Sequence, residues 1–182
     1  MSDAEDFEAF VRAHQDMVYA TALRLLGRPA DAEDVAQTVF LRAFRHHASL
    51  AGNPAAPGWL KTVATNLCLN HLTRYRARWR LFSEIGSASD TSDAPQPFED
   101  TLPAPTMTDH PLEAQQQAAA LEAAIGRLPD HQRVPLVLFH FEHLSYQEIA
   151  GRLGVSLGKL KTDIHRGRET LRGWLALDHG PR

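Results

Sequence analysis

A proline-rich, acidic segment near the middle of the chain limits the folds available to it. Residues 83–111 contain five prolines and six acidic residues but no lysine or arginine. Such a segment buries too little apolar surface to offset the entropy lost on ordering, so we expect a flexible linker there. On both sides, apolar residues recur at helical spacing without strand-like alternation. The sequence therefore predicts an all-α protein with two small helical domains, residues 1–82 and 112–178, joined by this linker.

The charge of the chain is divided unevenly between its segments. The formal net charge is only −3, which by itself argues against a nucleic-acid partner. Residues 51–82, however, contain five Lys or Arg and no acid, and residues 131–182 contain eight basic and five acidic residues. Residues 83–130 between them carry a net charge of −8. Two basic blocks separated by an acidic one are compatible with DNA binding by each domain.

Cellular location is indicated by what the sequence lacks. The chain does not begin with the basic and apolar regions of a secretory signal, and its longest apolar run, residues 134–141, is too short to span a bilayer. Cys68 is the single cysteine, which fits a reducing compartment. We therefore expect a cytoplasmic protein without membrane insertion.

The C-terminal part has the helix start and stop signals of a helix-turn-helix. Ser145 and Glu148 have the spacing of a capping box, which places a helix start at Tyr146. Gly154 supplies a turn, and Ser156 is a suitable cap for the next helix.

The second of these helices is amphipathic and basic. One face carries the apolar spine and the other carries small, polar and basic residues, as a recognition helix requires for packing on its partner and presenting donors to DNA. An ordinary solvated amphipathic helix is the alternative, but the helix, glycine turn and basic helix together favour the helix-turn-helix. The spine is Leu160, Ile164, Gly167 and Leu171; the opposite face is Gly158, Thr162, His165, Arg166 and Glu169; the flanks are Lys159, Lys161, Arg168 and Arg172.

A second basic helix is predicted in the N-terminal domain, over residues 58–80. Its apolar stripe, Leu60, Val63 and Leu67, leads into a tail in which arginines alternate with Tyr75 and Trp79. Basic residues with interleaved aromatic rings suit a separated DNA strand, because the charges follow phosphates while the rings stack on bases. A run of charged residues is usually only a solvated helix face, but the absence of acids from residues 51–82 makes this interpretation less satisfactory here. The basic tail residues are Arg74, Arg76, Arg78 and Arg80.

The helix predicted upstream, around residues 31–45, has an unusual outer face. Ala32, Ala36, Val39, Phe40 and Ala43 share one side, which leaves Asp34, Gln37, Leu41 and Arg45 on the other. Leu41 is either a lone surface leucine or the anchor of a protein contact, and the sequence gives these equal weight.

Three segments together resemble the extracytoplasmic-function sigma factors, small two-domain members of the sigma-70 family of bacterial RNA polymerase initiation subunits. DAEDVAQTVFLRAFR is similar to the family's region 2.2, and GWLKTVATNLCLNHLTRYRAR to its regions 2.3 and 2.4. The segment from Leu128 to Leu171 is similar to region 4.

The resemblance implies a division of labour. Asp34, Gln37 and Leu41 would bind core RNA polymerase. A loop at residues 48–57, with Asn66, would capture a base flipped out of the minus-ten element. Backbone contacts there would come from Lys61, Arg74, Arg76, Arg78 and Arg80. The minus-thirty-five element of promoter DNA would be bound by Lys159, Lys161, Thr162, His165, Arg166 and Arg168.

Strand opening of this kind has no chemical step, so we expect no enzyme activity, catalytic residue, metal or cofactor. The resemblance also implies control by an anti-sigma factor. Some residues depart from the family pattern, namely Lys159-Leu160, Asp163 and Gly167, and these concern the promoter sequence rather than the function.

Two other functions deserve comparison. A helix-turn-helix regulator that does not associate as a sigma subunit would carry a receiver or ligand-binding domain first, and residues 1–82 show no sign of one. A metal protein is suggested by His140 and His143 around Glu142, and by Cys68 with His71. No further ligands follow at a recognisable spacing, so we expect no metal site.

Overall fold

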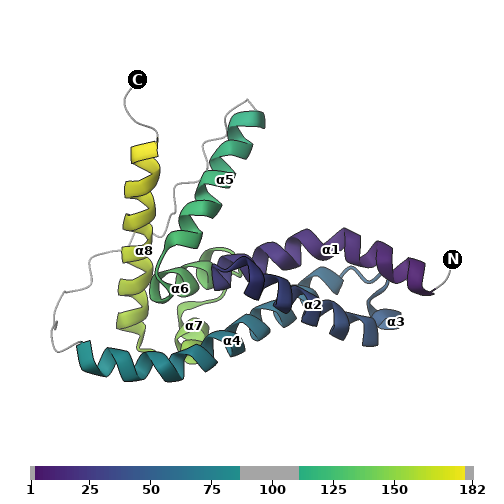
Figure 1. Cartoon of the computed structure of the whole chain (residues 1–182), viewed down its shortest axis with the longest axis horizontal. Coiled ribbons are helices and arrows are strands. Elements are labelled where there is room, and N and C mark those ends of the chain that lie inside the picture. Colours follow the sequence, from purple (N-terminus) through teal and green to yellow (C-terminus); the bar gives the residue numbers. More distant parts are fainter. Residues whose placement is uncertain (1–2, 87–110, 179–182) are drawn as a thin grey trace.

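The structure, a computed structural model, describes residues 3–86 and 111–178, with side chains for residues 5–73 and 115–176 (Figure 1). Both stretches consist of helices joined by short turns, and neither contains a β-strand. The predicted all-α class is thus confirmed. The helices are α1 (Asp3–Leu26), α2 (Pro29–Arg45), α3 (His47–Leu50), α4 (Ala56–Gly86), α5 (Pro111–Arg127), α6 (Asp130–His140), α7 (Tyr146–Leu153) and α8 (Leu157–Asp178).

Helices α1 to α4 form one group, which we call the N-terminal bundle. Helix α1 packs against α2 and α4, and α2 also packs against α4. Helix α2 turns its buried residues to this core at steps of three and four, the spacing of one helix face. These residues are Ala32, Val35, Val39 and Ala43.

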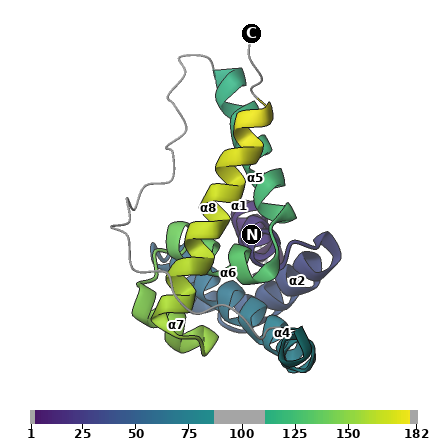
Figure 2. The ribbon, with the colours of Figure 1, turned by 90° about the vertical axis from the view of Figure 1, so that its left-hand side faces the viewer.

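Helices α5 to α8 form the C-terminal bundle. Helix α8 is its centre and packs against α5, α6 and α7, and Figure 2 shows α5 and α8 rising side by side from the rest. The short helices α6 and α7 also contact each other. The core contains Ile125, Leu128, Leu136, Leu138, Ile149, Leu160, Ile164 and Leu171, all fully buried.

The predicted linker agrees only in part with the helix bounds. Helix α4 continues to Gly86, past the domain boundary predicted at residue 82, and α5 begins at Pro111, the last residue of the predicted linker. The rest of that segment, residues 87–110, lies outside the described residues.

The two bundles are in contact. Helix α1 touches α5 and α6 as well as its own bundle, and Figure 1 shows the end of α1 meeting the C-terminal bundle beside α6. Within the two described stretches, no helix combines the length and the apolar character needed to cross a lipid bilayer.

Candidate nucleic-acid and polymerase interfaces

The predicted capping box is present at the start of α7. The Ser145 hydroxyl accepts a hydrogen bond from the Glu148 amide at 3.3 Å, and Glu148 Oε2 accepts from the Ser145 amide at 2.9 Å. The bond from the Ser145 backbone is the main reason that the pKa of Glu148 is lowered, followed by the bond from the Ser145 hydroxyl. Gly154 ends α7 in the left-handed conformation with φ 63°, and the Ser156 hydroxyl accepts from the Lys159 amide at 3.2 Å. These contacts cap the start of α7 and both sides of the turn between α7 and α8.

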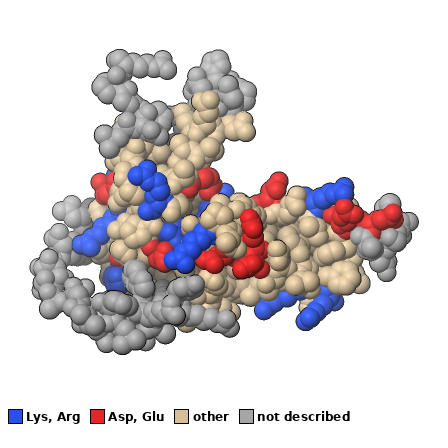
Figure 3. Space-filling view, viewed as in Figure 1, with Lys and Arg blue, Asp and Glu red and all other residues tan. Residues whose placement is uncertain are grey.

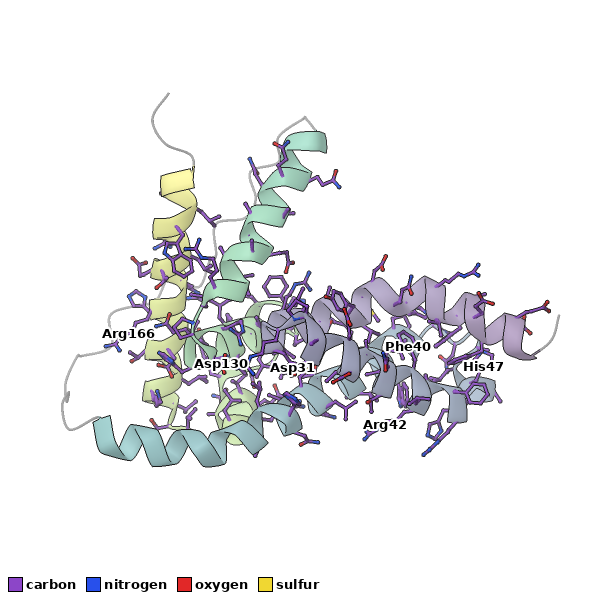
Figure 4. All side chains as sticks on the ribbon, viewed as in Figure 1. Asp31, Phe40, Arg42, His47, Asp130 and Arg166 are labelled. Atoms are coloured by element: carbon purple, nitrogen blue, oxygen red, sulfur yellow. The ribbon has the colours of Figure 1, made fainter. Side chains whose placement is uncertain are left out.

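Helix α8 presents the outer face that its sequence predicts. Leu160, Ile164 and Leu171 are buried, whereas Thr162, His165 and Arg166 are exposed. Figure 4 shows Arg166 projecting away from the bundle. Gly167 lies on the buried side, where an added Cβ would come within 3.0 Å of Leu136 Cδ1. The glycine therefore permits close packing of α8 on α6, which offsets its low helix propensity.

Arg168 does not belong to that outer face, which corrects one member of the predicted minus-thirty-five set. The residue is only 4% exposed. Its Nε donates a hydrogen bond to His140 Nε2 at 3.1 Å, and its guanidinium carbon lies 5.6 Å from the Phe139 ring centroid. A long side chain on the flank of a helix can turn toward either face. Arg168 turns inward and ties α8 to the end of α6.

Lys159 and Lys161 flank the exposed face in different environments. Lys159 Nζ donates to Asp163 Oδ2 at 2.8 Å, and Asp163 is itself buried. Lys161 is exposed, with its Nζ 5.9 Å from the Tyr146 ring centroid. Lys161 joins Thr162, His165 and Arg166 on the surface, while the charge of Lys159 is compensated within the protein.

The predicted minus-ten residues lie along α4. Asn66 is exposed. Lys61 is half-buried, and its ammonium group points toward the C-terminal bundle. Lys61 Nζ donates to the Phe141 carbonyl at 3.2 Å and lies 3.4 Å from Glu142 Oε1. The backbone of residues 74–80 is helical as part of α4. The side chains of Arg74, Arg76, Arg78 and Arg80 lie outside the described residues.

The loop before α4 is held by local hydrogen bonds. The Asn53 side chain donates to the Ser49 carbonyl at 3.2 Å and accepts from the Ala55 amide at 2.9 Å. Gly52 has φ 70°, a conformation that a glycine adopts without strain. The loop expected at residues 48–57 is shorter in the structure, because residues 48–50 belong to α3 and residues 56–57 to α4.

The outer face of α2 combines polar residues with two apolar ones. Asp34, Gln37 and Leu41 are all exposed, and Leu41 is 68% exposed. Phe44, which the sequence reasoning did not single out, is 58% exposed and lies one turn further along. Its position three residues after Leu41 is the signal that would have identified it. Two neighbouring exposed apolar side chains favour a protein contact over a lone surface leucine.

Charge on the surface is mixed. Figure 3 shows Lys and Arg interspersed with Asp and Glu on the visible face, with no continuous basic surface among the side chains it colours. On this face, positive charge is therefore carried by separate residues and not by a broad patch.

Cys68 and the histidines lie in separate surroundings. Burial raises the pKa of the Cys68 thiol to about 12, and nearby Glu142 adds to the effect. His71 Nε2 lies 3.8 Å from Asp31 Oδ1, and His140 accepts from Arg168. Among the described residues, no three His, Cys, Asp or Glu side chains are grouped as a metal site would require.

Family models match both parts of the chain. Sigma-70 region 2 matches residues 10–78, which covers most of the N-terminal bundle, and Sigma-70 region 4 matches residues 118–171, which includes α6, α7 and most of α8.

Known proteins give the same family. The ECF RNA polymerase sigma factor SigE of Mycolicibacterium smegmatis is 39% identical over 93% of this chain, which spans 62% of that relative's length. ECF sigma factor SigW of Bacillus subtilis is 30% identical over 93% of this chain and 89% of its own. Among solved structures, the sigma factor RpoE of Bartonella quintana, in complex with the anti-sigma factor NepR, is similar at 22% identity with a TM-score of 0.46, covering 94% of this chain and 97% of that one. The chain belongs to the extracytoplasmic-function group of the sigma-70 family.

Proposed function

We propose that this protein binds core RNA polymerase in the cytoplasm and directs transcription initiation at specific promoters. The observation that carries the proposal is the exposed face of α8, where Lys161, Thr162, His165 and Arg166 stand on a capped helix-turn-helix within the region 4 match. A helix of this kind enters the major groove, and an arginine there pairs with guanine O6 and N7. This face would bind the minus-thirty-five element.

The N-terminal bundle would supply polymerase binding. Asp34, Gln37 and Leu41 are exposed on one face of α2, and Phe44 extends its apolar part. Exposed apolar side chains surrounded by polar ones are typical of a protein contact. An anti-sigma factor that controls the protein would compete for the same surface.

Strand opening at the minus-ten element would fall to α4 and the loop before it. Asn66 is exposed on α4, and α4 continues through the four alternating arginines at residues 74–80. Lys61 would hold the DNA backbone once its present contacts are released. No nucleophile or cofactor is needed, because the unpairing of bases is paid for by binding.

Reconstitution tests this function directly. Purified protein would be mixed with core RNA polymerase and a promoter library, and transcript starts would be mapped. We expect a stable complex with core polymerase and starts at promoters that share two sequence elements. The absence of both a core complex and promoter-specific starts would contradict the proposal. DNA binding without these would indicate a helix-turn-helix regulator that is not a sigma subunit.

A further inference from the structure

Two aromatic rings stack where α6 meets α7. The Phe139 ring near the end of α6 and the Tyr146 ring at the start of α7 have centroids 4.6 Å apart, and their planes differ by only 7°. Both residues are half-buried. The capping box at Ser145 fixes the backbone directly before Tyr146. The Tyr146 ring is thus held by its neighbour on α6 and by the start of its own helix.

Helix α8 places one cation against each ring. The guanidinium carbon of Arg168 lies 5.6 Å from the Phe139 ring centroid, and Lys161 Nζ lies 5.9 Å from the Tyr146 ring centroid. The two cations are seven residues apart, which is close to two helical turns, so they share one stripe of α8. Both distances are within the range in which a cation is attracted by the face of an aromatic ring.

The two cations differ in what surrounds them. Arg168 is 4% exposed, and its Nε donates to His140 Nε2 at 3.1 Å, so its contact with Phe139 belongs to the interior of the bundle. Lys161 is exposed and stands beside Thr162 on the face of α8 proposed to contact DNA. The contact with Tyr146 therefore involves a residue whose proposed role lies outside the bundle.

Lys161 is held without loss of its charge. Lys159 donates to the Asp163 carboxylate at 2.8 Å, and that negative charge compensates its own. Lys161 makes no ion pair with any residue whose side chain the structure describes. A tyrosine ring is uncharged at neutral pH and attracts a cation through its quadrupole. The ammonium group can thus stay on the ring and still direct N–H donors to a phosphate or a base edge.

Restraint of this side chain favours DNA binding. A lysine that is free in solvent samples many rotamers, and their loss on binding opposes association. A ring that already restrains the ammonium group in the free protein reduces the freedom that remains to be lost. Such preorganisation raises affinity without adding a contact to the DNA.

From these observations we infer that Tyr146 is a positioning residue for DNA binding: its ring holds the Lys161 ammonium group at the DNA-facing surface of α8, and the lysine makes the contact. The inference rests on the proposed function, because it requires that α8 binds the minus-thirty-five element. It gives α7 a part in that binding through the side chain it holds.

A double-mutant cycle in the full-length protein tests this role. The probe is a fluorescent duplex that the wild-type protein has selected from a random pool. Tyr146→Leu removes the ring but stays apolar, and it should weaken binding by about two- to fivefold, the effect of an exposed cation–π contact. Lys161→Met removes the charge and should also weaken binding. When Lys161→Met is already present, Tyr146→Leu should have no further effect.

Arg166→Ala provides the matched background. Arg166 projects from the same helix away from the bundle (Figure 4) and is proposed to contact the same DNA. If Tyr146→Leu merely loosened the bundle, it would weaken binding equally in both backgrounds. We expect its full effect beside Arg166→Ala and none beside Lys161→Met. Equal effects in the two backgrounds would overturn the positioning role.

Tyr146→Phe separates the ring from the hydroxyl group. It should restore the affinity lost in Tyr146→Leu, because phenylalanine presents the same kind of face to a cation. A loss as large as that of Tyr146→Leu would mean that the hydroxyl group touches DNA itself, and would overturn the inference. Tighter binding by Tyr146→Leu would also overturn it, because the ring would then withhold Lys161 from DNA.

NMR of the wild-type protein gives a readout that does not depend on the folding of any Tyr146 variant. Protons above the face of an aromatic ring resonate upfield, so the terminal methylene protons of Lys161 should be shifted upfield in the free protein and in the duplex complex. Lys161→Met identifies these signals by their absence. Signals at ordinary positions in the complex would show that the lysine leaves the ring, contrary to the inference.

Failure of this inference and failure of the proposed function give different results. If no duplex is selected, or if Lys161→Met binds as tightly as the wild-type protein, the DNA-binding face assigned to α8 is wrong. If Lys161→Met weakens binding but shows no coupling to Tyr146→Leu, only the positioning role is wrong. Promoter-specific starts with core polymerase are scored separately.

Discussion

Lys159 Nζ and Asp163 Oδ2 lie 2.8 Å apart, one turn from each other on the helix proposed to contact the minus-thirty-five element. Asp163 is buried and Lys159 is exposed, so the pair places a compensated charge at the edge of the DNA-facing surface. The departure from the family pattern at Lys159 and Asp163 thus has a structural explanation, because the charge of the lysine is neutralised by a carboxylate on the same helix.

Asp163→Asn should release Lys159 to phosphate. We expect tighter binding to a minus-thirty-five duplex and a salt slope steeper by about one counterion, as one added phosphate contact gives. Titration of the duplex at several salt concentrations measures both. Glu33→Gln, which removes an exposed acid from α2, is the control and should leave the slope unchanged. An unchanged slope for Asp163→Asn would mean that Lys159 does not reach DNA.

Alanine variants of Arg166 and Arg168 should show that Arg166 contacts DNA and that Arg168 stabilises the fold. Arg166→Ala should relax preference at one base pair and cost about 1–3 kcal/mol of specific binding, with the melting temperature nearly unchanged. Arg168→Ala should lower the melting temperature, because it removes the bond to His140 inside the bundle. Binding to single-substituted duplexes and thermal unfolding would be measured for both variants. The same profile for both variants would contradict the placement of Arg168 inside the bundle and of Arg166 on the DNA-facing surface.

The arginines at the end of α4 should act at a different step. Removing two of Arg74, Arg76 and Arg78 should weaken open-complex formation and reduce its salt dependence, while binding to the upstream duplex is retained. Permanganate reactivity of unpaired thymines measures opening. If these variants behaved like Arg166→Ala, two separate DNA surfaces would be the wrong description.

Alanine substitutions at Gly27 and Gly52 should separate backbone strain from a clash with a neighbouring side chain. Both have positive φ, but an added Cβ at Gly52 meets no atom within 4 Å, whereas at Gly27 it meets Arg133. Gly52→Ala should cost about 1–2 kcal/mol of stability from backbone strain alone. Gly27→Ala should cost more, and chemical denaturation measures the difference. Equal costs would show that Arg133 yields without penalty.

Cys68 should make stability depend on alkaline pH. Its pKa is raised to about 12, so between about pH 9 and 12 the unfolded chain loses the thiol proton while the folded chain keeps it. The folded state then binds more protons, and the free energy of unfolding falls as pH rises. Denaturation at pH 8, 9 and 10 should show this decline, and Cys68→Ala should lessen it. Rapid alkylation of the native thiol at pH 8 would contradict the buried placement.

Much of the helix-turn-helix could be predicted from sequence because its determinants are local. Ser145, Glu148 and Gly154 act within a few residues of one another, and the spine of α8 follows from helical periodicity. Arg168 shows the limit of this reasoning, since a residue on the flank of a helix has its direction decided by its neighbours in space. His140 and Phe139, which receive its side chain, lie on another helix.

The contact between the bundles was beyond the reach of one sequence. Arg133 meets Leu25, Leu26 and Gly27 across more than half the chain, and neither a basic residue in a helix nor a glycine after one indicates such a partner. The family resemblance assigns Lys61 to DNA, and nothing in the sequence places Glu142 beside it. Periodicity shows which face of a helix is buried but not which distant residue covers it.

The Arg24–Glu122 pair, which joins α1 to α5, is partly open to water, so its strength depends on the surrounding electrolyte. Ion pairs that are partly open to water weaken as salt is added, whereas an apolar interface would strengthen or stay unchanged. We expect the Arg24–Glu122 pair to hold the two bundles together less strongly as ionic strength rises, while the apolar residues of both bundles that share one core keep their contribution.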